Sequence, residues 1–217
     1  MTSTGGTQLR DLPEPPEVHR YLARHHPLSW GAPLPTKAEL LAKHGQEPVR
    51  RALETLCARA ATEPTTTAEF VAALSDDSTS YKLESRVKSP QSLARKYADL
   101  LETLDEDEPD DVLRSTMLTE SPNRRIAGSI GQRNSANHRS TLRLRLATGL
   151  GMHSYTGGSR YKGIHVGFRR SSGETIEVQF HSNASARVKE ATTPPYEVER
   201  SAAASPAERS AARVLCI

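Results

Sequence analysis

Apolar residues recur at helical spacing along the N-terminal part of the chain. From Glu17 to about Ala61 the pattern is helical. Thr36 suits the N-cap of a second helix, and Pro48 suits the first turn of a third. We therefore expect the N-terminal region to be built from helices.

This helical pattern is interrupted twice. Residues 62–68 are rich in threonine and contain a proline, so we expect a turn or linker there, with Thr67 capping a short helix over 69–74. A longer amphipathic helix is predicted from about Pro90 to Leu104, and the acidic run 105–111 ends it.

Patterns typical of strands dominate the second half of the chain. Residues 112–118 are apolar and β-branched. The segments Tyr161–Arg169 and Thr175–His181 alternate apolar and polar residues on either side of a turn at 170–173, which predicts a β-hairpin. Residues 142–146 alternate leucine and arginine, which favours a further strand with one basic face.

Helices are expected again at about 182–191 and 196–204. The order of helices, then strands, then helices is that of an α+β protein. We expect residues 1–16 to be a disordered tail, residues 17–75 to be a helical region, and residues 205–217 to be a C-terminal tail.

Composition and charge narrow the classes of function. The chain has 217 residues with a formal net charge of +3 at pH 7. Residues 1–111 hold 13 Lys and Arg against 19 Asp and Glu, whereas residues 112–217 hold 16 against 7. The basic C-terminal half indicates a polyanionic ligand. The composition excludes a membrane protein, a collagen and a disulfide-rich scaffold.

The apolar runs, the N-terminus and the cysteines of the sequence indicate the compartment. The sequence has no run of about 18 apolar residues that could span a bilayer, and its N-terminus lacks the apolar segment of a Sec signal. Cys57 and Cys216 lie far apart, which favours reduced thiols over a disulfide. We expect a cytoplasmic protein that acts in the cytosol, with export by a route other than Sec left open.

The second strand of the predicted hairpin carries the most informative polar residues. Glu177, Gln179 and His181 share one face of this strand, because side chains alternate along a strand, and the apolar residues share the other face. The polar row is either the solvated side of a half-exposed sheet or part of a functional site.

The first strand of the hairpin offers a complementary surface. Tyr161, Gly163 and His165 share one face of it. A glycine inside a strand is costly unless something approaches it closely, and beside an aromatic residue a stacked nucleobase is a reasonable occupant. Arg160 and Lys162 add positive charge nearby.

Acidic residues lead into the strand at 112–118. Asp110 and Asp111 are both candidates to face Glu177 from a neighbouring strand, with Arg114 close to them. Two carboxylates brought together in this way can hold Mg²⁺, which prefers carboxylates, water and substrate phosphates. Such an ion can also lower the pKa of an attacking hydroxyl.

A basic loop precedes the helix at 90–104. Ser89 suits the N-cap of this helix, which is a structural role. Arg86, Lys88 and Lys96 can instead capture phosphate together with the amides at the helix N-terminus.

The order of these motifs resembles the RelA/SpoT-type (p)ppGpp synthetase (alarmone synthetase) domain, in a divergent branch seen in phage-associated and toxin-like proteins. The matching segments are R-x-K-S at 86–89 followed by Lys96, Y-K-G-I-H at 161–165, and E-V-Q at 177–179. The resemblance spans about residues 81–200, so we assign residues 81–204 to such a domain. It implies a nucleotidyltransferase-like fold, with a mixed β-sheet flanked by helices and a helical N-terminal extension.

The resemblance also implies a reaction, which is transfer of pyrophosphate from ATP to the 3′-hydroxyl of a guanine or adenine nucleotide, giving (p)ppGpp-like alarmones. Asp111 and Glu177 would hold Mg²⁺, and Glu177 would help to deprotonate the hydroxyl. Substrate binding would fall to Arg86, Lys88, Ser89, Lys96, Arg114, Arg160, Tyr161, Lys162, His165 and Gln179, with Tyr161 stacking on the acceptor base.

Departures from the family pattern leave alternatives open. Residues 132–156 contain no convincing match to the ATP-side segment, and Gly163 stands where the family has serine. The same fold could instead act as a toxin that pyrophosphorylates tRNA, or could be a catalytically degenerate domain that binds a nucleotide or a partner protein. Residues 1–80 could be a regulatory, neutralising or delivery segment, so an antitoxin or a delivery partner is also an open expectation.

Overall fold

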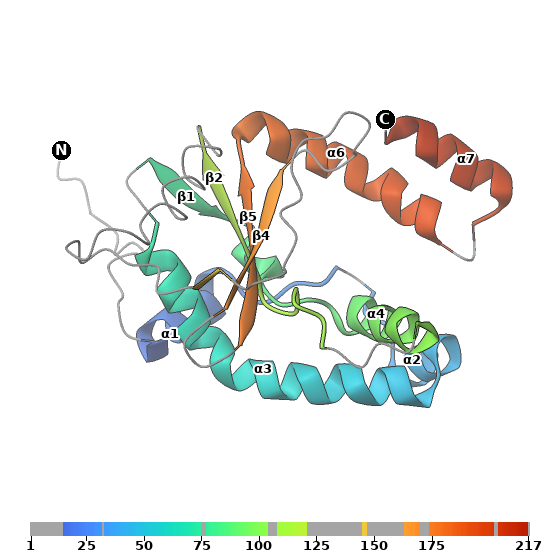
Figure 1. Ribbon diagram of the computed structural model, residues 1–217, viewed down its shortest axis with the longest axis horizontal. Helices are drawn as coiled ribbons and strands as arrows, with labels where there is room; N and C mark the ends of the chain where they lie inside the picture. The colour runs from blue at the N-terminus through green and yellow to red at the C-terminus, as the bar shows by residue number, and fades with distance from the viewer. Residues whose placement is uncertain are drawn as a thin grey trace.

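A mixed β-sheet of five strands in the order β1-β2-β5-β4-β3 forms the centre of the protein (Figure 1). The computed structural model describes residues 15–31, 33–74, 77–103, 108–120, 145–146, 163–169, 174–201 and 204–216. Six α-helices flank the sheet within these residues, so the predicted α+β class is confirmed.

Four pairings join the strands, and the hairpin pattern predicted one of them, that of β4 with β5. β1 (Ser78–Tyr81) runs antiparallel to β2 (Arg114–Thr119), β2 runs parallel to β5 (Thr175–His181), and β4 (Ile164–Arg169) runs antiparallel to both β5 and β3 (Arg145–Leu146). The bounds of β5 are those predicted, and the hairpin of β4 and β5 is confirmed. Its turn at 170–173 lies outside the described residues, and β1 was not predicted.

Helices form the N-terminal region, as predicted. They are α1 (Pro15–His25), α2 (Lys37–His44), α3 (Gln46–Ala72) and α4 (Pro90–Glu102). Thr36 caps α2 in a capping box with Glu39, and the Ser89 hydroxyl accepts from the Ser92 amide at the start of α4. Both predicted caps are confirmed.

The linker predicted at 62–68 is wrong, because α3 continues through it. Tertiary contacts outweigh the poor helix propensity of threonine and proline there. Glu63 and Thr67 are buried, and the Thr67 hydroxyl donates to the Glu63 carboxylate at 2.6 Å within the helix. Figure 1 shows α3 bending part way along its length, as expected for a helix that contains Pro64.

The C-terminal helices also differ from the prediction. A single helix, α6 (Asn183–Arg200), replaces the two predicted at 182–191 and 196–204, although Pro194 and Pro195 lie inside it. The segment predicted as a tail contains α7 (Pro206–Leu215), whose capping box joins Ser205 and Glu208. This start signal is the one that predicts α2, so α7 was predictable from the sequence.

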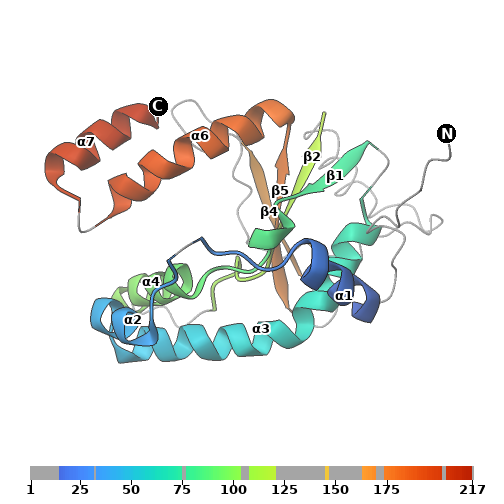
Figure 2. The same cartoon turned by 180° about the vertical axis from the view of Figure 1, so that it is seen from behind.

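The two faces of the sheet are covered differently. Its apolar face packs against α1 and the C-terminal part of α3, as both views show (Figures 1 and 2). The register places Ile164 opposite Phe180 and Val166 opposite Val178, and all four side chains are buried. A second apolar cluster joins α2, α3 and α4.

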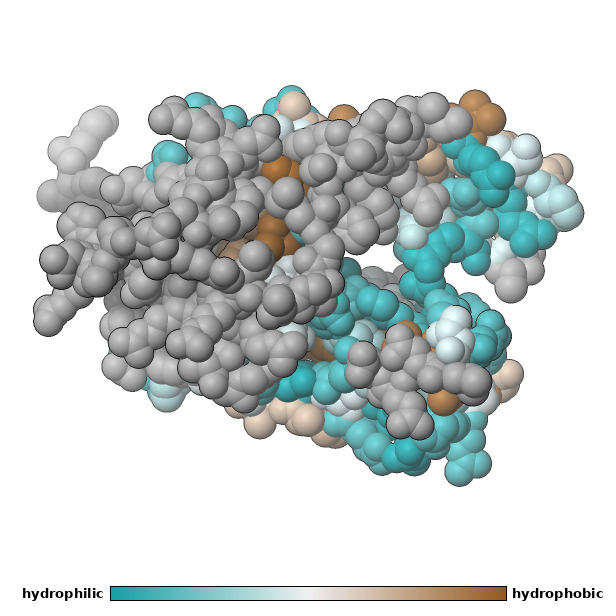
Figure 3. Space-filling view, in the orientation of Figure 1, coloured by the Kyte–Doolittle hydropathy of each residue, from teal (hydrophilic) through white to brown (hydrophobic). Residues whose placement is uncertain are grey.

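The other face of the sheet is polar and is nevertheless buried. His165, Gln179 and His181 are 8%, 5% and 1% exposed, and α6 contacts β2 and β5. The polar row is therefore not the solvated side of a half-exposed sheet. Figure 3 shows a hollow between the α6–α7 pair and the α4 side of the molecule, edged mainly by hydrophilic residues.

None of the described helices combines the length and the apolar character needed to cross a membrane.

Candidate functional site

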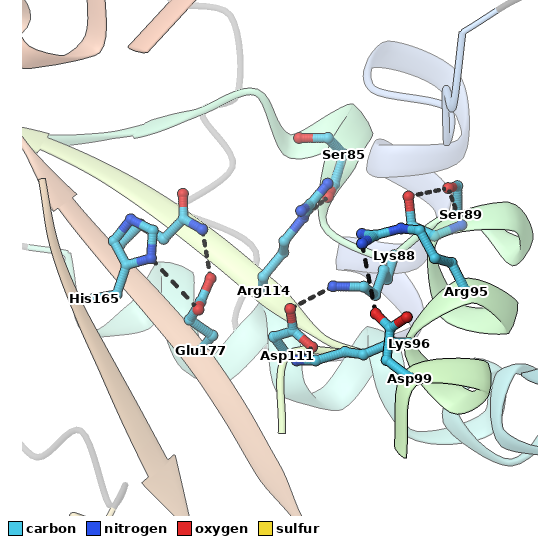
Figure 4. A network of polar contacts seen from close by, with 12 residues as sticks. Ser85, Lys88, Ser89, Arg95, Lys96, Asp99, Asp111, Arg114, His165 and Glu177 are labelled. Carbon is cyan, nitrogen blue, oxygen red and sulfur yellow. Dashed lines mark hydrogen bonds and ion pairs between the residues drawn. The ribbon is translucent and has the colours of Figure 1, made fainter. Parts of the chain in front are cut away.

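Two neighbouring parallel strands bring a carboxylate and a guanidinium together. Arg114 of β2 is the register partner of Glu177 of β5, and the Glu177 amide donates to the Leu113 carbonyl at 3.0 Å. Because side chains on paired residues project from the same face, Arg114 and Glu177 lie side by side (Figure 4). The parallel pairing, which the sequence did not predict, makes these two residues neighbours.

Glu177 is held from both of its oxygens. Gln179 Nε2 donates to Oε1, and His165 Nδ1 lies 3.5 Å from Oε2. Burial acts to raise the pKa of Glu177, but His165 and Gln179 outweigh it, and the net pKa is lowered. Glu177 is therefore an ionised carboxylate in a largely buried position.

Asp111 forms the second acidic centre. Lys96 Nζ donates to its Oδ1 at 2.7 Å, and Lys88 Nζ donates to its Oδ2. Burial acts to raise the pKa of Asp111, but the two ammonium groups outweigh it and hold the pKa at about 2. Of the two aspartates left open by the sequence, Asp111 is the one whose carboxylate meets the basic residues.

The basic groups come from three elements. Lys88 precedes α4, Lys96 lies on α4 and Arg114 begins β2, where its Nε donates to the Ser85 carbonyl at 3.1 Å. In Figure 4 the Arg114 side chain lies between the Glu177 group and the Asp111 group. Ser89 caps α4 beside the Asp111 group. The structure therefore brings these predicted residues together.

The Arg86 side chain, in contrast, is buried and bonds to groups inside the protein. Its side chain is 5% exposed and its Nε donates to Glu63 at 2.7 Å. Its Nη1 donates to the carbonyls of His26 and Leu83, each at 2.8 Å. These contacts anchor the segment after α1 to α3, so the predicted phosphate contact of Arg86 is not supported by its position.

Gly163 has a close neighbour, but that neighbour is a protein side chain. A Cβ placed on Gly163 would lie 2.2 Å from His181 Cε1, so the imidazole occupies the space expected for a nucleobase. His181 Nδ1 lies 3.1 Å from the Ser185 hydroxyl. Burial lowers the pKa of His181 to about 4, so its ring is neutral at pH 7.

Lys189 is a site residue that the sequence analysis missed. Its Nζ donates to Gln179 Oε1, which also accepts from the Thr116 hydroxyl at 3.3 Å. The lysine lies on α6, and helical spacing alone does not show that α6 crosses the polar face of the sheet. The usable signal was the short link at Ser182, which turns the chain from the polar strand directly into this helix.

Three of the predicted substrate-binding residues lie outside the described residues: Arg160, Tyr161 and Lys162. The segment 132–156, which has no match to the ATP-side segment of the family, also lies outside them except for residues 145–146.

The donor chemistry of Asp111 and Glu177 fits Mg²⁺. Both are ionised, and the charge of Asp111 acts on the pKa of Glu177, so the two are electrostatically coupled. Within the described residues no group of three or more His, Cys, Asp or Glu could hold a metal ion alone. Mg²⁺ is usually held by one or two carboxylates together with substrate phosphates, so this pair matches a site that a phosphate completes.

Comparison with known proteins identifies no relative: no protein-family model matches the chain, and no curated protein matches it.

Proposed function

We propose that the protein transfers pyrophosphate from ATP to a hydroxyl group of a guanine or adenine nucleotide, as RelA/SpoT-type alarmone synthetases do. The observation that carries this proposal is the placement of Glu177 beside Arg114, next to Asp111 with its two lysines. An ionised carboxylate can accept a proton from a hydroxyl that attacks a phosphate group, and the neighbouring cations can neutralise the charge of that phosphate.

Charge favours a highly anionic substrate at this site. Lys88, Lys96 and Arg114 outnumber the two carboxylates Asp111 and Glu177. A triphosphate supplies the missing negative charge. When it binds, we expect Lys88 and Lys96 to turn from Asp111 to the phosphates, where lysine acts as a mobile point charge.

The proposed step is an in-line displacement at the β-phosphorus of ATP. The acceptor oxygen forms a bond to this phosphorus, the bond to the α,β-bridging oxygen breaks, and AMP leaves with that oxygen. Glu177 accepts the proton of the acceptor hydroxyl, and Arg114 with the lysines neutralises charge on the transferred group. Mg²⁺ held by Asp111 and Glu177 would neutralise phosphate charge and make the hydroxyl more acidic.

We further propose that strands β2 to β5, with α4 and α6, belong to a nucleotidyltransferase-like domain over residues 81–204 that acts in the cytosol and shares its apolar core with α1 and α3. The order of the motifs supports this, together with the convergence of Lys88, Asp111 and Glu177.

The test is release of AMP by the full chain incubated with ATP, Mg²⁺ and one acceptor at a time. GDP, GTP, ADP, ATP and deacylated tRNA are the acceptors. We expect AMP release with a free nucleotide and a loss of at least about 100-fold in Glu177→Gln. Glu54→Gln, which changes an exposed carboxylate on α3, is the matched control.

Each outcome of this assay is informative. Label from ATP appearing only on tRNA would replace the nucleotide acceptor by RNA. No AMP with any acceptor, together with calorimetric binding of ATP, would favour a degenerate nucleotide-binding domain. Equal activity of Glu177→Gln and the wild type would contradict the role of Glu177.

A further inference from the structure

Lys189 reaches the polar face of the sheet, where its ammonium bonds to an amide oxygen. Its ammonium donates to the amide oxygen of Gln179, and no ion pair joins it to any acidic residue in the described part of the chain. Burial and the nearby charge of Arg114 lower its pKa to about 8, although the charges of Glu177 and Glu190 act to raise it. Keeping an ammonium here is costly, so stability alone does not account for Lys189.

The hydrogen bond from Lys189 determines which way the Gln179 amide faces. An amide has a donor end and an acceptor end, whereas an ammonium can only donate. Lys189 and the Thr116 hydroxyl both donate to Oε1, so Nε2 is directed to the opposite side. There Nε2 donates to Oε1 of Glu177.

The result is a relay of hydrogen bonds from α6 to Glu177. With Oε1 held by Gln179, the other oxygen of Glu177 faces His165 at 3.5 Å. If the amide turned over, its oxygen would face the carboxylate, and two acceptors would repel each other. Without Lys189, Oε1 of Gln179 loses its ammonium donor and keeps the weaker Thr116 hydroxyl, so the amide is held less firmly in this orientation.

We propose that Lys189 is a positioning residue that orients Glu177 through the amide of Gln179. The effect of Lys189 on catalysis rests on the proposed transfer reaction. The hydrogen-bond relay itself exists in the protein without substrate. Lys189 acts on the geometry of the proton acceptor, so its loss affects the chemical step more than binding of ATP.

The kinetic test compares Lys189→Met with Lys189→Arg in the AMP-release assay. We expect Lys189→Met to lower kcat by about 10- to 100-fold with little change in the KM for ATP, the usual range for a residue that orients a reactive group. Arginine can still donate to Gln179, so Lys189→Arg should stay within about threefold of the wild type. Arg187→Met, an exposed change on the same helix, is the matched control.

Two results would overturn the proposal. A change confined to KM would mean that Lys189 binds substrate directly. An equal loss of kcat in Lys189→Met and Lys189→Arg would mean that donation to Gln179 is irrelevant.

A substrate-free measurement separates this inference from the proposed function. In thermal unfolding of the full chain, the Tm shifts of Lys189→Met and Gln179→Met should be strongly non-additive in the double variant, because both remove the same bond. Non-additivity in a protein that never releases AMP would refute the reaction and retain the relay. Additive shifts in an active enzyme would refute the relay and retain the reaction.

Discussion

At the scale of single residues, Gly163 and His181 make a contact that leaves no room for a side chain. A Cβ on Gly163 would lie 2.2 Å from Cε1 of an imidazole that is 1% exposed and bound to Ser185. We expect Gly163→Ala to lower the free energy of unfolding by about 1–3 kcal/mol, the usual cost of overpacking. Urea unfolding at pH 7 measures it.

The control for this prediction is a second truncation. In a His181→Ala background the added methyl group meets an empty space, so Gly163→Ala should cost clearly less. An equal cost in both backgrounds would show that the backbone, and not the imidazole, requires glycine.

Asp111 predicts a dependence of stability on pH. Its folded-state pKa of about 2 is below the ordinary value of 3.8, so its stabilising effect is present above 3.8 and is lost as the pH falls through about 2. The shift corresponds to about 2 kcal/mol. The difference in unfolding free energy between wild type and Asp111→Asn should therefore shrink toward zero between pH 5 and pH 2. A difference independent of pH over this range would contradict the ion pairs with Lys88 and Lys96.

The position of a site residue was predictable where it followed from the local sequence pattern. Alternation along β5 placed Glu177 and Gln179 on one face, and the structure bears this out. The pairing of Asp111 with Lys88 and Lys96 was not predictable, because it depends on how the loop before α4 meets the loop before β2. Arg86 has the same local setting as Lys88, yet its side chain turns to Glu63, and no spacing rule distinguishes the two.

At the scale of elements, a buried ion pair joins the helix α3 to the segment before α4. Glu63 and Arg86 have side chains 7% and 5% exposed. Removing one partner leaves a buried charge, so Glu63→Gln should cost about 3 kcal/mol. Glu54→Gln, in an exposed pair with Arg50, should change stability by less than about 1 kcal/mol.

The double variant Glu63→Met, Arg86→Met tests the role of Arg86 as well. Apolar residues of similar volume often replace a buried ion pair without loss, so most of the stability should return. AMP release should also persist, because Arg86 contacts backbone and Glu63 in this structure. A stable but inactive double variant would mean that Arg86 contacts the phosphates of the substrate.

Elements with a strong local signal were predicted well, and the others required tertiary information. Capping residues gave α2 and α4, and period-2 alternation gave β5. The threonines and the proline at 62–68 favour a break locally, but this stretch is helical in the folded protein, where Glu63, Thr66 and Thr67 are buried. The four-residue strand β1 has no apolar face of its own and exists because β2 pairs with it.

At the scale of the whole molecule, the two faces of one sheet have different roles, since one forms the core and the other carries the candidate site. The apolar face builds the core with α1 and α3, and the polar face carries Glu177 and Gln179, which Lys189 of α6 approaches. The basic excess after residue 112 predicted a polyanionic ligand, and Arg114 and Lys189 belong to that excess. Among the acidic residues before it, Asp111 belongs to the site, where it pairs with Lys88 and Lys96.

The most direct test of the proposed reaction is mass spectrometry of its products. The full chain is incubated with ATP, Mg²⁺ and each nucleotide acceptor, beside Glu177→Gln and Glu54→Gln. We predict that wild type and Glu54→Gln convert one acceptor into a species heavier by one pyrophosphate unit with one AMP per product, and that Glu177→Gln does not. ADP as the sole product from ATP, or the same product from Glu177→Gln, would contradict pyrophosphate transfer at this site.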